Sequence, residues 1–422
     1  MNQAFYTGII GLQSQQAGID VTSNNLANID TYGFKSNGIE FKSLFENALS
    51  TGSGGSPVNS TVGLGSTLQA TPTLMHAGSL MLTDSSTDLA IEGDGWFGVQ
   101  GNGQVMYTRA GNFGFDASRD LVNADGQYVL GTLSNNFDAN NVLTSKNTTT
   151  TMGNVDTQTS IKLPESLTYP AEPTTLTSFK GNLGQLDEVR KMGAKMVDAN
   201  GNKNVLDLTF TKTVPQPAVG SSWDVVATAS SPATLSTPST LYDTQTGVLT
   251  FDSTGALVSS TLNSINNNGT TVNIDLGTGY NGIVSNTNTV TASSQSNGLE
   301  AGELVGYDIN HNAEVIATFT NGRQVSMAKI GVFHFQNDQG LSQIDGSRFL
   351  ESQNSGKPIF FQDANGNNIL GASVINNKLE SSNVSTEVGL TELIIFQRAY
   401  DANAKLVTTG DQMIQKALQM HR

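Results

Sequence analysis

Gly93, Gly95 and Gly98 form a GxGxxG pattern, which in dinucleotide-binding domains sets backbone amides and a helix N-terminus against a pyrophosphate. That chemistry needs a helix directly after the glycines. Here a strand-like DLAIE precedes them, and FGVQGNGQV follows, which is typical of a strand and a hairpin turn. We therefore expect the glycines to form a tight turn or bulge beside Trp96 and Phe97.

Two acidic turns resemble the start of a calcium loop. Asp198 and Asp363 each begin the sequence DANGN, but neither loop has glycine at its sixth position. The twelfth position holds Thr209 or Val374, where a calcium loop has a bidentate glutamate. Hairpin turns are the expected structure, and no metal site is predicted.

Other catalytic chemistry finds no support in the residue pattern. The chain has no cysteine, which excludes disulfides, thiolate zinc sites and cysteine nucleophiles. Its four histidines are dispersed without HxxxH or HExxH spacing, and neither a GxSxG elbow nor a phosphate-binding GxxxxGK[ST] loop occurs. We predict no catalytic site and no cofactor.

Charge excludes two classes of partner. The 422 residues carry a formal net charge of −15, and only 14% of them are charged. Between Lys212 and Arg323 there is no Lys or Arg at all. Nucleic acids and anionic membranes both require a clustered basic face, so neither is expected as a partner.

The N-terminal segment lacks the features of a cleavable secretion signal. The first basic residue is Lys35, and Gly, Gln and Ser interrupt each apolar run. No segment approaches the roughly 20 apolar residues of a membrane span. The chain is expected to be soluble, or to leave the cell by a route that does not read such a signal.

Both ends of the chain carry helical apolar periodicity. A stripe with seven-residue spacing predicts one helix at each terminus, the second beginning near Ser385. At the N-terminus the stripe consists of Phe5, Ile9, Leu12, Ile19 and Leu26. At the C-terminus it consists of Leu393, Phe396, Tyr400, Val407, Ile414 and Leu418. Each helix alone would be marginally stable in water, so the pattern favours a polymer subunit; a helix pair packed on its own globular body is the alternative.

The middle of the chain is predicted to be β-structure. Short β-branched or aromatic runs alternate with Asn-Gly and Asp-Gly turns. Residues 146–299 become richer in Ser, Thr and Asn and are interpreted as a separate β-domain inserted into the first. Residues 51–66 are interpreted as an extended connector.

Three ordered blocks resemble the rod and hook family of axial proteins of the bacterial flagellum. The first block is similar to that family's NNLAN and TxGFK signature and comprises Asn24, Asn25, Leu26, Ala27, Asn28, Thr31, Gly33, Phe34 and Lys35. The second is similar to its DLAIxGxGFF and YTRxGxF blocks and includes Asp88, Gly93, Gly95, Trp96, Phe97, Tyr107, Arg109 and Gly111. The third runs from LESSN at 379–383 through QRAY at 397–400. Trp96 stands where the family usually has Phe.

This resemblance implies a mainly β fold with α-helical termini, in which the helices pair as a coiled-coil-like inner domain and two β-domains lie outside, one inserted in the other. The implied boundaries are 1–35 with 380–422 for the helical inner-tube domain, 36–71 with 377–379 for an extended connector, 72–145 with 300–376 for the first β-domain, and 146–299 for the insert.

Within the family, hook-type sequence is the better match, because of the long insert and of residues 302–323 and 329–356. The resemblance implies a homopolymer that forms a curved hollow tube outside the cell and transmits torque as a flexible joint. Implied partners are distal rod, hook cap and hook–filament junction proteins and the flagellar type III export apparatus. A distal rod protein is the alternative within the family, and a secreted β-rich adhesin is the alternative from another class.

Overall fold

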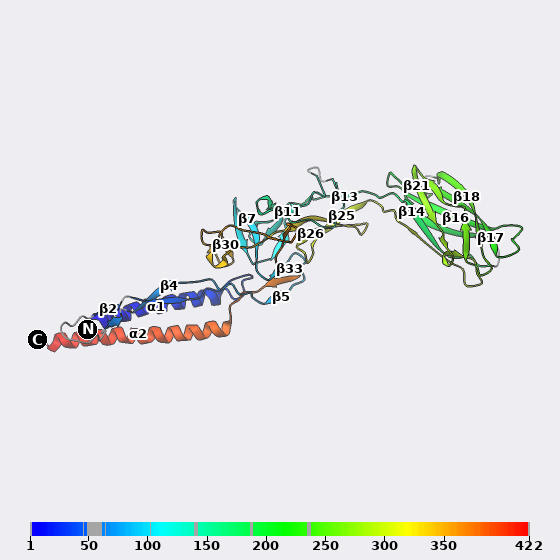
Figure 1. Ribbon diagram of the computed structural model, residues 1–422. Coiled ribbons are helices and arrows are strands. Elements are labelled where there is room, and N and C mark those ends of the chain that lie inside the picture. The colour runs from blue at the N-terminus through cyan, green and yellow to red at the C-terminus, as the bar shows by residue number, and fades with distance from the viewer. Residues whose placement is uncertain are drawn as a thin grey trace.

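The computed structural model describes residues 2–44, 46–48, 61–63, 65–101, 103–138, 142–185, 189–233 and 238–420. The molecule is elongated (Figure 1). A pair of helices occupies one end, a first β-domain lies in the middle, and a second β-domain forms the other end. The expected mainly β fold with helical termini is confirmed.

The two helices, α1 (Asn2–Ala27) and α2 (Thr386–Met420), run antiparallel and project away from the β-domains (Figure 1). Both helices lie within the ranges 1–35 and 380–422 that were expected for the helical domain, and the residues between helix and sheet form a polar junction. Helix α2 starts next to the predicted Ser385, whose Oγ accepts a hydrogen bond from the Val388 N–H at 3.5 Å. Across the part of the chain that the structure describes, neither helix is long and apolar enough to cross a membrane.

Glycines set the close approach of the helices. A Cβ at Gly8 would lie 2.9 Å from Val407, and one at Gly18 would lie 2.9 Å from the Phe396 ring. In the other direction, a Cβ at Gly389 would lie 2.3 Å from Leu26. Apolar side chains of one helix therefore fill spaces that glycines leave on the other.

The segment expected to be an extended connector contains paired strands. Strand β1 (Glu40–Ser43) pairs antiparallel with β4 (Ser66–Ala70), and β2 (Glu46–Ala48) pairs with β3 (Thr61–Gly63). The Ser14 hydroxyl of α1 donates to the Ser66 carbonyl, so this ribbon is held against the helix pair. Residues 51–60 and 64 of the predicted connector lie outside the described residues.

The first β-domain is built around a large antiparallel sheet, whose central order is β13-β25-β26-β27-β11-β7-β8-β30-β29. The strands of this domain before the insert are β5 (Leu80–Leu82), β6 (Leu89–Glu92), β7 (Trp96–Gly101), β8 (Gln104–Thr108), β9 (Phe113–Phe115), β10 (Leu121–Asn123), β11 (Tyr128–Leu133), β12 (Thr159–Ser160) and β13 (Thr168–Tyr169). Those after the insert are β25 (Gly302–Ile309), β26 (Glu314–Phe319), β27 (Gln324–Ile330), β28 (Val332–Phe333), β29 (Ser342–Gln343), β30 (Arg348–Leu350), β31 (Phe361–Gln362), β32 (Asn368–Ile369), β33 (Ser373–Asn376) and β34 (Lys378–Glu380). Two 3₁₀ turns, Val155–Thr157 and Asp338–Gly340, lie between them.

The second β-domain has two sheets that enclose one core. The first sheet consists of β14 (Leu176–Asn182), β20 (Ser264–Asn267), β21 (Thr270–Asp275), β22 (Gly277–Thr278), β23 (Asn281–Val284) and β24 (Thr291–Ser296). The second consists of β15 (Arg190–Val197), β16 (Lys203–Lys212), β17 (Ser221–Ser230), β18 (Leu241–Phe251) and β19 (Leu257–Ser260). Phe179 and Val272 from the first sheet meet Leu208 and Trp223 from the second in this core.

The insert begins later than the expected residue 146. Strand β12 pairs with β11, and β13 pairs with β25, so both belong to the first β-domain. Ile161, Leu163 and Leu167 are buried in that domain's core. The polar composition of this stretch comes from its solvent-facing positions and hides the buried residues that anchor it.

Candidate functional site

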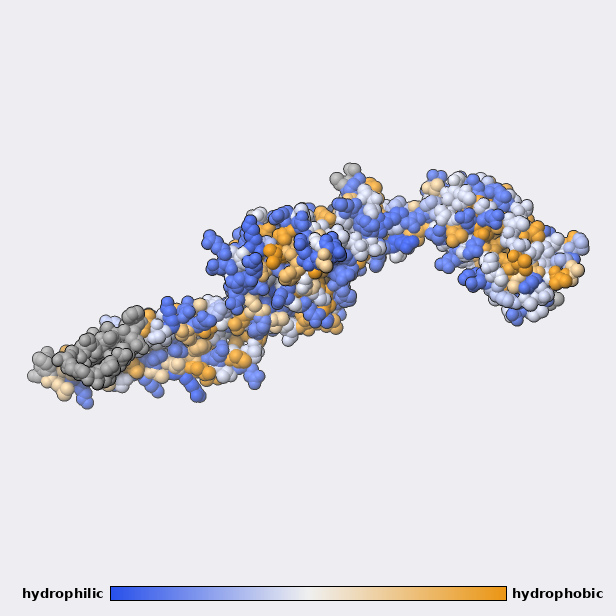
Figure 2. Space-filling view, in the orientation of Figure 1, coloured by the Kyte–Doolittle hydropathy of each residue, from blue (hydrophilic) through white to orange (hydrophobic). Residues whose placement is uncertain are grey.

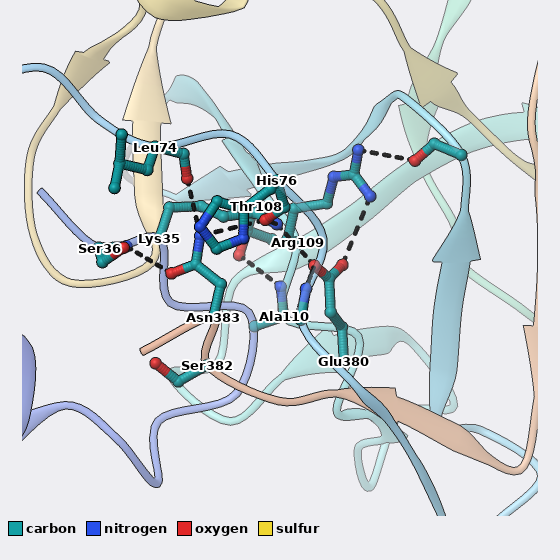
Figure 3. A network of polar contacts seen from close by, with 12 residues as sticks. Lys35, Ser36, Leu74, His76, Thr108, Arg109, Ala110, Glu380, Ser382 and Asn383 are labelled. Carbon is teal, nitrogen blue, oxygen red and sulfur yellow. Dashed lines mark hydrogen bonds and ion pairs between the residues drawn. The ribbon is translucent and has the colours of Figure 1, made fainter. Parts of the chain in front are cut away.

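The three sequence blocks that resemble the axial family meet at one buried polar cluster, which joins the helix pair to the first β-domain (Figure 3). At its centre is the carboxylate of Glu380, at the end of β34. Its Oε1 accepts hydrogen bonds from Lys35 Nζ at 2.6 Å and from the Gly78 backbone N–H at 3.0 Å. Its Oε2 lies 3.4 Å from Arg109 Nη1. We call Lys35, Arg109, Glu380 and Asn383 the junction cluster.

Arg109 connects the cluster to the glycine turn. Its Nη2 donates to the Gly93 carbonyl at 2.9 Å, and its guanidinium lies 5.5 Å from the centre of the Trp96 ring. The turn joins β6 to β7 and has positive φ at Gly93 and Gly95, so a strand and not a helix follows the GxGxxG pattern. In this chain the glycine turn therefore binds the Arg109 side chain, through the backbone carbonyl of Gly93.

Lys35 is almost completely buried, with 1% of its side chain exposed. Its ammonium also donates to the His76 carbonyl at 3.0 Å. Burial lowers the pKa of Lys35, while the nearby Glu380 carboxylate acts in the opposite direction. One carboxylate thus faces two buried cations, so Glu380 is the group on which the charge balance depends.

Two motif glycines allow the backbones at the cluster to touch. Gly33 has a φ of 66°, and a Cβ there would lie 2.3 Å from the Ala110 nitrogen. A Cβ at Gly111 would lie 1.9 Å from the Leu89 carbonyl oxygen. The Gly33 N–H also donates to the Glu380 carbonyl at 2.8 Å.

Two asparagines tie the ends of the helices to this cluster. Asn383 Oδ1 accepts the Ser36 N–H at 2.7 Å, and its Nδ2 donates to the Leu74 carbonyl at 2.8 Å. Asn25 exchanges two hydrogen bonds with the backbone of Asn37, at 2.8 and 2.9 Å. The last turn of α1 and the residues just before α2 are therefore fixed to the same backbone segment, Ser36–Asn37.

The structure does not bring every motif residue into the cluster. Asn24 and Ala27 are exposed, and the side chain of Asn28 hydrogen-bonds its neighbours Asn24 and Thr31. Among the remaining motif residues, Asp88 forms a bridge with Asn112. Those buried in or beside the first β-domain are Phe34, Trp96, Phe97 and Tyr107.

Glu380 and Asn383 were not among the predicted site residues, although both lie in the LESSN segment of the third block. Nothing near them in the sequence reveals their partners, because Lys35 is 345 positions away. The sequence feature that could have indicated Glu380 was an acidic residue between a predicted strand and a predicted helix, in a chain with few charged residues.

Asp198 and Asp363 lie in hairpin turns. Asp198 Oδ1 accepts the N–H groups of Asn200 and Asn202 at 2.9 and 2.8 Å. Asp363 accepts the N–H groups of Asn365 and Asn367 in the same way, at 2.8 and 2.9 Å. Across the described ranges, no group of three histidine, aspartate or glutamate side chains could hold a metal ion.

A second junction, the linker, joins the two β-domains through residues 170–175 and 297–301. Glu172 and Leu299 exchange two backbone hydrogen bonds, at 2.8 and 2.9 Å. Thr174 bonds Val197 of the insert through both its N–H and its hydroxyl. The linker is therefore a two-stranded connection with defined hydrogen bonds at each end.

Ion pairs gather at this linker in a chain that is poor in charge. Glu172 Oε1 lies 2.6 Å from Lys146 Nζ, and Glu172 Oε2 lies 3.9 Å from Arg323 Nη2. Glu300 Oε2 lies 2.7 Å from Lys203 Nζ of the insert. The hydrogen bond from Lys146 holds the pKa of Glu172 below its usual value. Ion pairs thus connect one strand of the linker to the first β-domain, through Glu172, and the other strand to the insert, through Glu300.

All eleven predicted stripe residues lie on α1 and α2. Ten are partly covered, and Leu418 is exposed. A second set of apolar side chains on α2 is exposed in the isolated subunit: Val388, Leu390, Ile394, Ile395, Leu406, Met413 and Met420. Figure 2 shows orange atoms among blue ones along the visible lower face of the helix pair. Helix α2 therefore has one apolar face against α1 and another without a partner among the described residues of the subunit.

Comparison with known families gives four matches that follow one another along the chain. They are "Flagella basal body rod protein" at residues 5–35, "Flagellar hook protein FlgE/F/G D1 domain" at 90–173, "Flagellar basal body protein FlaE D2 domain" at 190–369 and "Flagellar basal body rod FlgEFG protein C-terminal" at 375–420. The first and last contain the two helices, and the middle two contain β-structure.

Relatives match over nearly the whole length. The flagellar hook protein FlgE of Borreliella burgdorferi is 26% identical, with 100% of both chains covered. FlgE of Salmonella typhimurium is 29% identical and that of Escherichia coli 28%, each covering 97% of this chain and 98% of the relative. A crystal structure of Helicobacter pylori flagellar hook protein FlgE2 is 16% identical, with a TM-score of 0.49, and covers 71% of this chain and 100% of that one.

The full-length matches to hook proteins and the ordered matches to the hook and rod domains agree with the motif blocks that meet at the junction cluster. The chain belongs to the flagellar hook protein family.

Proposed function

We propose that this chain polymerises through its terminal helices into the curved hollow tube of the flagellar hook, with its β-domains on the outside. The observation that carries the proposal is the second apolar face of α2. Monomeric proteins rarely leave a contiguous apolar surface without a partner. Such a face on a helix pair that projects from the folded body suits packing against the helices of other copies.

Under this proposal the two junctions differ in stiffness, the junction cluster being rigid and the linker flexible. The buried junction cluster would fix the helix pair to the first β-domain, because it combines charge, hydrogen bonds and close backbone contact. The linker would allow the insert to reorient, since its ion pairs are partly exposed and each is worth little. Torque would pass through the tube while the outer domains adjust to bending.

The outer surfaces are expected to exchange neighbours as the hook rotates. A hydrogen bond traded against water has a small net free energy, so polar surfaces can slide at low cost. The insert also exposes some apolar side chains, including Val214, Val258 and Tyr280. Figure 2 shows scattered orange areas on the mixed surface of the second β-domain, which is compatible with several weak contacts.

The proposed setting is the exterior of the cell, after export through the flagellar type III apparatus. Proposed partners besides further copies are the distal rod, the hook cap and the proteins of the hook–filament junction. Membership of the hook family supports this placement, as a component of the flagellar hook and basal body.

The test is electron microscopy of basal bodies from a strain that lacks the gene and is complemented with variants. Leu12→Ala, Leu393→Ala and Ile414→Ala should each cost up to about 2–5 kcal/mol per site once the helices are packed, and should leave rods and rings without a hook. Gln412→Ala, at an exposed position of α2, is the matched control and should assemble.

Other outcomes would contradict the proposal. A rod that stops short in the gene deletion would indicate a distal rod protein. Intact hooks in the deletion would point away from an axial role. Normal assembly of all three stripe variants would show that the helices are not the polymerisation contacts.

A further inference from the structure

An exposed apolar patch lies on the first β-domain, next to the base of the helix pair. Strand β5 exposes 37% of Leu80, 48% of Met81 and 78% of Leu82. Among the described strands, β5 pairs with β34 alone, so its other edge is free. We call Leu80, Met81 and Leu82 the β5 patch.

The patch lies at the opposite end of the helix pair from the chain termini (Figure 1). Strand β34, with which β5 pairs, leads directly into the start of α2. Figure 2 shows apolar atoms reaching this lower edge of the domain. A second copy placed head to tail along the helix axis would bring the tip of its helix pair to this edge.

The last turns of α2 have matching chemistry. Met413, Leu418 and Met420 are 59%, 67% and 80% exposed, the highest exposed fractions among the large apolar side chains of the described helices. Flexible methionines suit an apolar partner surface whose shape is not regular.

Charge gives the contact its direction. The first turns of α2 carry Glu387 and Glu392, with no basic residue before Arg398. Within the docking segment 413–420 the charged residue is Lys416, and Asp411 lies just before that segment. Head-to-tail placement brings Lys416 of one copy toward the acidic base of the next, whereas tip-to-tip placement would not. The helix dipoles of two α2 helices also align favourably in this arrangement.

We infer that the β5 patch is the docking surface for the C-terminal turns of α2, residues 413–420, from a second copy of this chain. The inference rests on the proposed polymerisation and specifies one of its contacts. Each subunit would then have the β5 patch at the base of its helices and, at the other end of the helix pair, the α2 segment that binds the patch of a neighbouring copy. A heterologous contact of this kind propagates into a helical polymer.

Disulfide trapping tests the contact, because the natural chain has no cysteine. Leu82→Cys with Leu418→Cys is introduced into the full chain, and isolated hooks are oxidised and run on a denaturing gel without reductant. A ladder of covalent multimers is expected, whereas either single variant should give dimers at most. Leu82→Cys with Leu406→Cys, which moves the second cysteine to the middle of α2, is the control and should give no ladder.

Hooks that assemble but show no ladder for Leu82→Cys with Leu418→Cys would overturn the inference, and so would an equal ladder in the control. Neither result affects the proposed polymerisation, which fails only if the natural chain forms no hook. A bond to a different flagellar protein would identify another occupant and also overturn it.

A charge exchange provides a second measurement if the cysteine variants do not assemble. Glu392→Lys and Lys416→Glu should each raise the critical concentration for polymerisation of the purified chain, about fivefold. The double variant should restore it. Absence of restoration would contradict the head-to-tail contact.

Discussion

Glu380 and Lys35 form an ion pair with 2.6 Å between Oε1 and Nζ, and each side chain is only 1% exposed. They lie 345 positions apart and belong to the segments that follow α1 and precede α2. The pair therefore links the N-terminal and C-terminal segments of the chain at the point where the helices meet the first β-domain. Arg109, from the middle block, shares the same carboxylate.

Removal of Glu380 should be more damaging than removal of Lys35. Glu380→Gln leaves two buried cations without a counter-charge, for which we expect a loss of about 3–5 kcal/mol in the free energy of unfolding. Lys35→Met keeps the apolar stem and leaves Glu380 paired with Arg109, so a loss of about 1–2 kcal/mol is expected. Urea unfolding of the purified subunit measures both. Equal losses would show that charge balance does not govern the cluster.

Gly111 should not tolerate a methyl group. Gly111→Ala places Cβ 1.9 Å from the Leu89 carbonyl oxygen, so the backbones of two segments must separate. A loss of about 3 kcal/mol or more is expected from this overpacking. Gly114→Ala, three positions away with no atom within 4 Å of its Cβ, is the matched control and should change stability little. Thermal unfolding compares the two, and similar melting temperatures would disprove the close contact.

The glycines between the two helices should also differ in how well they tolerate a larger side chain. Gly18→Leu must displace the Phe396 ring, which lies 2.9 Å from the Cβ position, and should separate the helices and prevent assembly. At Gly410 the nearest atom is 3.7 Å away, so Gly410→Ala should fit and gain up to about 1 kcal/mol in helix propensity. Circular dichroism reports the helix content and sedimentation reports assembly. Normal polymers from Gly18→Leu would argue against this register.

The linker should loosen in acid. Since the pKa of Glu172 is lowered in the folded chain, its pairing contributes fully above the unfolded pKa, about 4.3, and is lost as pH falls through the lower folded value. Electron spin resonance can measure the distance between labels at Gln104→Cys and Thr244→Cys, one on each β-domain. The distance distribution should widen as the pH falls through the lowered folded pKa of Glu172, and at high salt, because the pairs are partly exposed.

Glu172→Gln is the control for this prediction. It should give the wider distribution at neutral pH and remove the change with acid. A distribution that is unchanged by the substitution would mean that the backbone hydrogen bonds alone set the orientation of the insert.

Local patterns in the sequence were sufficient for the elements. Seven-residue apolar spacing predicted the two helices, and alternating runs with Asn-Gly and Asp-Gly turns predicted β-structure, because helix and strand periodicity depend on neighbouring residues alone. The glycine turn before Trp96 was likewise recognisable from the strand-like residues on both sides of it. The motif blocks were sufficient for the family.

The tertiary structure decided what those elements do together. It placed Glu380 against Lys35 and Arg109 and showed that Ile161 and Leu163 belong to the first β-domain. It also left one face of α2 without a partner in the described part of the subunit. Pairing across hundreds of residues depends on which backbones approach closely, and a linear pattern does not record this. A buried charge has a specific partner only because the fold excludes water around both groups.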